Sequence, residues 1–338
     1  MPYVVYAHGM MDPYFARIAP MKFLAKRLVW FAAQGSVLHH ADRVLFTSRL
    51  EQRFATRTFP RPAFHSHVVA YGAKEGGPRD THALSVILPR LDGRRYLLYL
   101  GRIHEKKGGD LLIDAFAQLA ASDPALDLVM AGPEPDGFGA SLRQRARSLG
   151  IDHRIHWPGM ISGAVKAAAF QGAEAFVLPS HQENFGIAVA EALSHGCPVL
   201  ISDQVNIFAE IRQANAGLVA PDTPEGVSRL LTAWAATPPQ QRALMARNAR
   251  QLFQKCFTPE AAANDLDRIL HSAIETKVRT MGKLVRPIAA RPVGPATPSA
   301  PAAGPSRRRS SAPHPARSRP ASPVTLPTPN EAPLENTP

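Results

Sequence analysis

The chain has little cysteine and no long apolar run. Only Cys197 and Cys256 occur in 338 residues, and they lack the paired spacing of a zinc site, which argues against a disulfide-stapled fold and favours a reducing compartment. No stretch approaches the roughly 18 to 20 uncharged residues that a spanning helix needs, and residues 1–6 are too short for a secretory signal. We therefore expect a cytoplasmic protein with both cysteines buried as apolar side chains.

Large apolar side chains become scarce near the end of the chain. Arginines at 307–309, 317 and 319 lie there among repeated Pro, Ala and Ser, a composition that cannot offset the entropy of ordering. We predict a disordered tail over 276–338. The tail also carries much of the formal net charge of +12, so we favour a solvated extension over a nucleic-acid arm and expect no specific nucleic-acid partner.

Strand and helix patterns alternate in the middle of the chain. This alternation predicts parallel strands with crossover helices, a doubly wound sheet that binds its ligand at the carboxyl ends of the strands. We assign this domain to 95–275. The expected strands are 96–100, 127–131, 154–157, 175–178 and 198–202, and the expected helices 110–121, 139–149, 163–171, 185–195 and 207–214.

A shorter region precedes this domain. Residues 1–75 show strand patterns at 3–6, 43–46 and 67–70, and a polar, turn-rich linker is expected at 76–94. Between them, residues 21–38 form an amphipathic helical pattern with a basic side. Such a helix either docks on anionic lipid headgroups or packs in the core with a solvated face, and we favour the second interpretation.

The first chemical motif follows the strand at 96–100. It reads Gly101-Arg102-Ile103-His104-Glu105-Lys106-Lys107-Gly108-Gly109 and opens a helix. Glycines let the backbone approach a ligand, the helix start offers free amides, and Arg102 with Lys107 can neutralise a diphosphate. A solvated turn explains this motif equally well when it is taken alone.

The second motif places two acids around a strand-to-helix junction. Glu183 is expected in the loop at the helix start and Glu191 about two turns inside the helix. The amides of Asn184, Phe185 and Gly186 would face an anionic ligand, and each carboxylate could accept hydrogen bonds from hydroxyl groups. Glu183 could instead cap the helix, but Glu191 lies in an apolar run and needs a partner there.

Together these residues resemble glycosyltransferase family four, whose members have the two-domain GT-B fold. The resemblance runs from about residue 2 to about residue 274. It is carried by the strand and His-Gly segment at 4–13, Thr47-Ser48 with Glu51, the Gly-Arg and Lys-Lys-Gly loop, and the paired glutamates separated by seven residues. It implies a complete Rossmann-like C-terminal domain, a partial Rossmann-like N-terminal domain and a retaining transferase.

The resemblance also implies roles for single residues. Arg102 and Lys107, with Gly101 beside them, would hold the donor diphosphate, Glu183 the sugar hydroxyls and Glu191 the ribose. A backbone contact with the base would come from Gly159 and Met160, and His8 would face the donor sugar from the first domain. We expect neither a metal nor a cofactor, because helix amides and the two cations can do the work of a metal ion.

The chain departs from the family pattern in two places. About a hundred residues that family members carry before the strand at 3–6 are absent, so we expect a misplaced start site, a degraded fragment or a separate chain that supplies the missing half, and favour the first two. In addition, Tyr71 stands where the family usually has Asn before Gly72, which weakens the assignment of a hinge there.

Two functional hypotheses follow. In the first, the chain moves a hexose-like sugar from a nucleoside-diphosphate sugar to a glycan or lipid-linked acceptor in surface polysaccharide biosynthesis, with peripheral contact at the inner membrane face. In the second, it is a non-catalytic donor-binding remnant or a basic interaction module that acts through its tail.

Overall fold

A computed structural model describes residues 3–13, 16, 19–59, 61, 63–77, 80 and 82–284 of the 338-residue chain, without the side chains of 281–284. Most of the predicted tail, from residue 285 on, lies outside these residues. The final helix α13 (Pro259–Leu284) extends past 275, the expected end of the second domain. No helix of the described part is long and apolar enough to cross a membrane.

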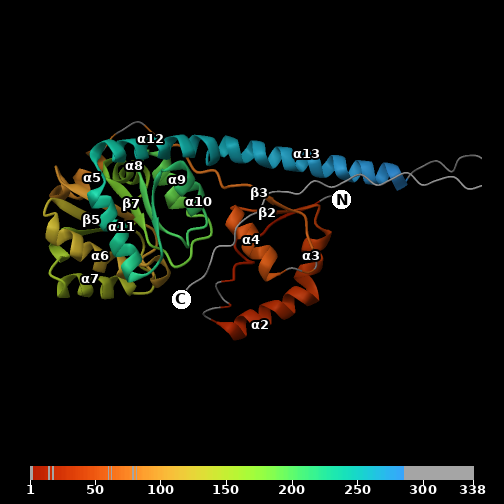
Figure 1. Cartoon of the computed structure of the whole chain (residues 1–338), viewed down its shortest axis with the longest axis horizontal. Coiled ribbons are helices and arrows are strands. Elements are labelled where there is room, and N and C mark those ends of the chain that lie inside the picture. The colour runs from red at the N-terminus through yellow and green to blue at the C-terminus, as the bar shows by residue number, and fades with distance from the viewer. Residues whose placement is uncertain are drawn as a thin grey trace, which may run out of the picture. The chain divides into compact units, whose positions relative to one another are not determined.

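The middle of the chain folds into a six-stranded parallel sheet, as the alternating pattern predicts. Its strands lie in the order β6-β5-β4-β7-β8-β9 (Figure 1). The chain therefore builds outward from β4 in one direction and then returns to add β7 on the other side, the doubly wound topology. The strands are β4 (Arg95–Leu100), β5 (Leu126–Ala131), β6 (Ile155–Gly159), β7 (Ala175–Leu178), β8 (Val199–Ser202) and β9 (Gly217–Ala220).

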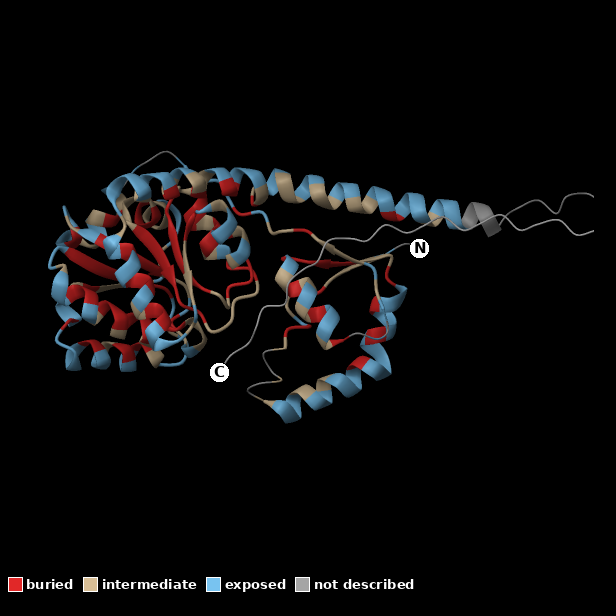
Figure 2. Cartoon of the chain, viewed as in Figure 1, coloured by how far each residue is buried: buried red, intermediate tan, exposed pale blue. Residues whose placement is uncertain are grey.

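Helices cover both faces of this sheet. One group packs α11 (Pro224–Ala236) on α6 (Gly109–Ser122) and α6 on α7 (Phe138–Ser148), and on the other face α12 (Pro239–Cys256) contacts α9 (Ile187–Ser194) and α10 (Phe208–Ala214). The inner strands between them are buried (Figure 2), which is why they read as nearly continuous apolar runs. Cys197 lies in this core as expected, whereas Cys256 is only half-buried, because it ends α12 at the edge of the core.

The residues before the linker form a second, three-stranded parallel sheet in the order β1-β2-β3. Its strands are β1 (Val4–Tyr6), β2 (Arg43–Phe46) and β3 (Ser66–Val68), and α4 (Arg49–Thr58) packs on the last two. A small separate apolar cluster that includes Trp30, Phe46 and Phe59 supports this sheet. The strand positions agree with the sequence patterns to within two residues.

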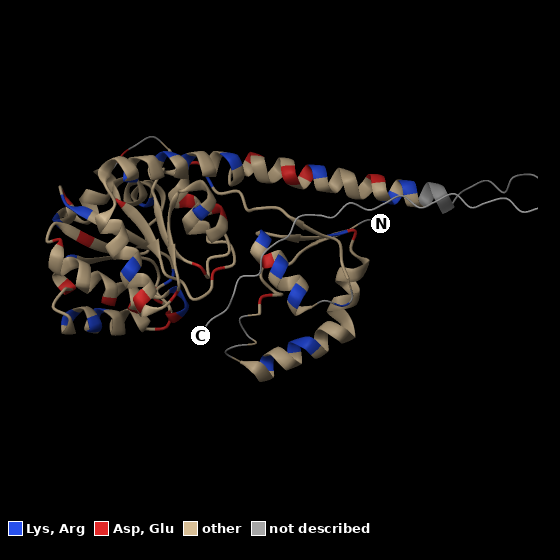
Figure 3. Ribbon diagram, viewed as in Figure 1, with Lys and Arg blue, Asp and Glu red and all other residues tan. Residues whose placement is uncertain are grey.

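The helical pattern at 21–38 forms α2 (Pro20–Val29), a π-helical segment (Trp30–Gln34) and α3 (Gly35–His40). Trp30 is buried and Phe23 packs against the small cluster, as a core helix requires. The side that carries Met21, Leu24 and Leu28 is exposed, however, and no residue of α2 is fully buried. Figure 3 marks the Lys and Arg positions of α2 in blue on the ribbon.

Two segments connect the sheets. Around Gly72 the chain passes against the start of α13, since a Cβ at Gly72 would lie 2.5 Å from Pro259 Cα. Helix α13 then reaches back to the smaller sheet, where Lys277 Nζ lies 3.1 Å from Asp42 Oδ1. The segment expected to be a linker carries a short helix, α5 (His82–Ile87), whose Leu84 is buried in the larger core.

Candidate functional site

The two chemical motifs meet at the switch point of the six-stranded sheet. Strands β4 and β7 are neighbours, and their crossover connections leave in opposite directions. The loop 101–108 follows β4 and the loop 179–186 follows β7, so both emerge at the carboxyl edge on the two sides of the same gap. Ligands of doubly wound sheets bind in this position.

Glycine shapes the first loop. Gly108 has a left-handed φ of 65° and opens α6, and a Cβ there would lie only 2.2 Å from Pro179 O. A side chain at 108 would therefore separate the two loops. Between Gly101 and Gly108, Glu105–Lys107 form a 3-10 turn that presents Lys107 toward the second loop.

Backbone contacts hold the second loop in place. His181 N donates to Lys106 O at 2.8 Å, and Glu183 is fixed on both sides, with its N donating to Gln204 O at 3.0 Å and its O accepting from Asn206 N at 3.0 Å. The loop thus rests on the first loop and on the segment after β8. The main-chain hydrogen bonds of Glu183 therefore fix the position from which its carboxylate extends.

Lys107 and Glu183 lie together. The Lys107 ammonium forms an ion pair with the Glu183 carboxylate, and both side chains are mostly buried. Arg102 is exposed, but its charge and that of Glu183 both act on the Tyr99 hydroxyl: burial raises the Tyr99 pKa, Glu183 adds to that rise and Arg102 opposes it. Two cations and one acid therefore surround the end of β4.

The helix after the second loop begins later than expected. Gly186 has a φ of 83°, which a helical residue cannot adopt, so α9 starts at Ile187 where the prediction placed its start at Phe185. Glu191 consequently lies about one turn inside the helix, not two. The Phe185 side chain is buried and packs on Phe257 at 5.5 Å between ring centroids, which anchors the end of this loop in the core.

Glu191 has a partner that the sequence reasoning missed. Lys166 Nζ, from α8 (Gly163–Gly172), lies 2.6 Å from Glu191 Oε1. Lys166 is the one charged residue of the helix sequence GAVKAAAFQG. The sequence offered one signal for this pair. Lys166 is a single lysine in an alanine-rich helix, and Glu191 lies in an apolar run where it needs a partner.

The residues that the sequence analysis assigned to the base lie at the end of β6. Gly159 has a φ of 72°, and Met160, with 77% of its surface exposed, follows it. Gly159 O accepts from Gly132 N at 2.8 Å, which ties this turn to the end of β5. Gly159 and Met160 are therefore on the same carboxyl edge as the two loops, two strands away from β4.

Three residues of the smaller sheet lie just beyond the carboxyl ends of its strands. His8 follows β1, Thr47 follows β2 and Tyr71 lies three residues beyond β3. The Tyr71 hydroxyl is hydrogen-bonded to His8 Nδ1, and the His8 ring stacks on Tyr6 at 4.9 Å. His8 adopts a left-handed φ of 46°, a conformation that is uncommon for a side chain of this size.

These aromatic residues of the smaller sheet reach the second loop, 179–186. The ring centroids of Tyr71 and Phe185 lie 5.2 Å apart in an edge-to-face arrangement. Burial, with a contribution from Tyr71, raises the pKa of Tyr6 to about 12, and burial also raises the pKa of Tyr71. Both phenols are therefore neutral hydrogen-bond donors near neutral pH.

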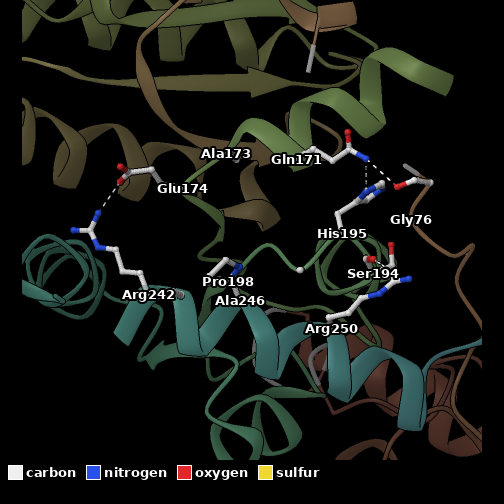
Figure 4. Close-up of a pocket in the computed structure, with 13 residues that line it drawn as sticks. Gly76, Gln171, Ala173, Glu174, Ser194, His195, Pro198, Arg242, Ala246 and Arg250 are labelled. Carbon is white, nitrogen blue, oxygen red and sulfur yellow. Dashed lines mark hydrogen bonds and ion pairs between the residues drawn. The ribbon is translucent and has the colours of Figure 1, made fainter. Parts of the chain in front are cut away.

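A hollow of about 510 Å³ lies elsewhere, at the amino ends of β7 and β8 (Figure 4). Its charged side chains are already paired: Arg242 lies 2.9 Å from Glu174, and Arg250 binds Glu75 and Ser194 O. Burial and the charge of Arg250 lower the pKa of His195 there. We assign no ligand to this hollow.

Acidic and histidine side chains do not gather around the two loops in a metal-binding pattern. Among residues 3–284, with the gaps given above, no three His, Cys, Asp or Glu side chains are placed to hold one metal ion. The ion pairs formed by the predicted site residues are Lys107 with Glu183 and Lys166 with Glu191.

The sequence of the larger domain matches a family model. The model described as "Glycosyl transferases group 1" covers residues 82–252, just over half of the 338 residues. The chain belongs to this family. Residues 82–252 include both chemical loops, Lys166 and the residues after β6.

Individual group 1 relatives are longer than this chain. Similarity to an alpha-D-kanosaminyltransferase of Streptomyces kanamyceticus reaches 30% identity over 245 residues, 70% of this chain and 61% of that protein. Across the first curated relatives that match, the chain spans between 29% and 61% of their length.

Solved structures agree with the fold. Anabaena Alr3699/HepE in complex with UDP-glucose superposes with a TM-score of 0.65 at 18% identity, over 80% of this chain and 72% of that one. WaaG, described as a glycosyltransferase involved in lipopolysaccharide biosynthesis, superposes with a TM-score of 0.63 at 20% identity, over 80% and 75%. The predicted GT-B fold of this group 1 chain is thus confirmed.

Proposed function

We propose that this chain binds a nucleoside-diphosphate sugar at the switch point of its larger sheet and transfers the sugar to an acceptor hydroxyl with retention of anomeric configuration. The observation that carries the proposal is the placement of Lys107, Glu183 and Glu191 on the two sides of the β4–β7 gap. A group 1 family match over the same residues supports it.

The proposed roles follow from charge and position. Lys107, with the exposed Arg102, neutralises the diphosphate, and the free amides at the start of α9 add partial positive charge. Glu183 accepts hydrogen bonds from sugar hydroxyls, and Glu191 accepts them from ribose. In the transfer, the bond from the anomeric carbon to the diphosphate oxygen breaks and a bond to the acceptor oxygen forms. The acceptor proton passes to the departing phosphate, so no metal or cofactor is required.

The acceptor is proposed only as a class of molecule. Tyr71, which is hydrogen-bonded to His8, is one of the side chains of the smaller sheet that contact the loop 179–186. We propose a glycan or lipid-linked acceptor, in the assembly of surface polysaccharide. The exposed apolar and basic side chains of α2 would allow contact with an anionic membrane surface.

Calorimetric titration with UDP and with GDP tests the donor site. Glu191→Ala and Arg102→Ala should each weaken binding of the nucleotide by at least tenfold, because each removes a charged partner of the ligand. Glu260→Ala on α13 and Arg247→Ala on α12, both exposed, are matched controls and should bind as wild type. Nucleotide binding that survives both site substitutions unchanged would refute the site.

A further inference from the structure

Thr47 lies at the carboxyl end of β2 and is buried together with Glu51. Thr47 is 1% exposed and Glu51 2% exposed. Both Thr47 N and Thr47 Oγ1 donate to Glu51 Oε2, each at 2.7 Å. The other carboxylate oxygen of Glu51 accepts from Gly9 N at 2.6 Å. One buried acid therefore ties the end of β2 to the turn that carries His8.

The direction of these hydrogen bonds defines a relay. Because Thr47 Oγ1 donates to Glu51 Oε2, the Thr47 hydroxyl proton points to Glu51 and the lone pairs of Oγ1 are left for a donor. That donor is Asn184 Nδ2, 3.2 Å away. The order Asn184 to Thr47 to Glu51 is thus fixed by chemistry, which also fixes the orientation of the Asn184 amide.

Asn184 is confined from the other side as well. A Cβ at Gly9 would lie 3.2 Å from Asn184 Cγ, so the amide packs directly against the His8–Gly9 turn. Asn184 Oδ1 is buried and has no hydrogen-bond partner among the described residues. One face of the Asn184 amide is packed and one of its hydrogens is engaged. The hydrogen bond to Thr47 is therefore the polar contact that holds this side chain.

We propose that Thr47 is a positioning residue for the sugar end of the donor site. It acts through Asn184, the neighbour of Glu183, and it uses the same carboxylate that holds Gly9 beside His8. The separation of His8 from the Glu183 loop is therefore set by one buried acid in the smaller sheet. This inference rests on the proposed function and adds that residues outside the larger sheet determine how tightly the sugar is held.

The test compares Thr47→Val, which keeps the shape of the side chain and removes the hydroxyl, with Thr47→Ser, which keeps the hydroxyl. UDP and UDP-glucose are titrated into each full-length variant. Thr47→Val should bind UDP with an affinity within twofold of wild type. The additional affinity that the sugar of UDP-glucose confers should fall about tenfold. Thr47→Ser should restore that affinity. Thr56→Val, which removes an exposed hydroxyl on α4, is the matched control.

Hydrogen exchange of residues 179–186 in the ligand-free variants gives a readout that needs no donor. Exchange should speed up in Thr47→Val and stay slow in Thr47→Ser. Asn184→Ala removes the same contact from the other side, so it replaces Thr47→Val if that variant does not fold. The double variant should be no worse than the worse single variant, since both changes break one bond.

The outcomes separate the two proposals. Normal UDP and UDP-glucose binding by Thr47→Val, or unchanged loop exchange, overturns the positioning role and leaves the donor site standing. If the wild-type chain binds neither UDP nor UDP-glucose, and likewise neither GDP nor GDP-mannose, the proposed function fails and the sugar-positioning role fails with it.

Discussion

The two sheets of this chain differ in how their residues are supported. The six-stranded sheet has helices on both faces, and its large apolar core includes residues from Ala73 to Phe257. The three-stranded sheet rests on a small separate cluster, and most of α2 beside it is exposed. Yet both sheets direct the carboxyl ends of their strands to the same loop, 179–186. Support by a large core is thus not required for a residue to reach the site, and buried polar contacts can substitute for it.

The largest expected effect comes from truncating one buried phenylalanine in each core separately. Phe176 in β7 and Phe46 in β2 are both fully buried, and truncation to alanine should cost about 3 to 5 kcal/mol in either place. Phe176→Ala should speed hydrogen exchange throughout 95–256 and abolish nucleotide binding. Phe46→Ala should speed exchange in 4–68 and leave nucleotide binding intact. Equal loss of protection in both regions by either variant would show that the sheets unfold as one unit.

Acid should weaken the larger sheet through Asp127. Burial opposes ionisation of this carboxyl group, but hydrogen bonds from Arg94, Arg154 and His156 outweigh it and lower its pKa to about 2. A depressed pKa contributes stability above the unfolded value near 4, and this contribution is lost as the pH falls toward 2. We expect a loss of about 2 kcal/mol over that window.

The measurement is urea unfolding at a series of pH values, for wild type and Asp127→Asn. The variant should be less stable at neutral pH because its arginines lose their counter-charge, and its stability should change less between pH 4 and pH 2. Parallel pH profiles would show that Asp127 does not carry the acid sensitivity.

A smaller effect is expected at Glu191 in the proposed donor site. Lys166 holds the Glu191 carboxylate, so Lys166→Met should weaken UDP binding about tenfold, or about 1.4 kcal/mol. Arg145→Ala breaks a partly exposed ion pair between α7 and Asp114 of α6 and should change neither binding nor stability by more than about 0.5 kcal/mol. Tighter UDP binding by Lys166→Met would mean that the lysine competes with the ligand.

The smallest effect should come from the phenol that holds His8. Tyr71→Phe keeps the ring packed on Phe185 and removes the hydroxyl from His8 Nδ1. We expect sugar transfer to slow about fivefold, or about 1 kcal/mol, with UDP affinity unchanged. Tyr3→Phe loses a comparable hydroxyl bond at an exposed position and serves as control. A Tyr71→Phe variant with weakened UDP binding would place Tyr71 at the nucleotide end.

Sequence patterns predicted the larger sheet well because its strands are buried on both faces and its helices alternate with them. The start of α9 was missed by two residues, since an aromatic residue and a glycine before an apolar run do not reveal the left-handed φ of Gly186. The roles of Arg102, Lys107, Glu183 and Glu191 came from motif spacing and remain predictions, although the structure gathers the loops that carry them.

Contacts between distant segments could not be predicted in this way. Neither the pairing of Lys166 with Glu191 nor the relay from Asn184 through Thr47 to Glu51 follows from local periodicity. They depend on which strand ends meet across the fold. The buried acid at 51 could have been suspected, because it follows a capping serine in the first turn of α4, but its partners could not have been named.

The chain crosses between its sheets twice, once on the way out near Gly72 and once on the return along α13. The two crossings touch, since Ala73 N donates to Phe257 O at 2.9 Å. A single tether would let the sheets swivel in any direction, whereas adjacent double crossings restrict them to bending about one line. A change in the angle between the sheets would then alter the ion pair of Lys277 with Asp42 near the far end of α13, so this pair would report on that angle.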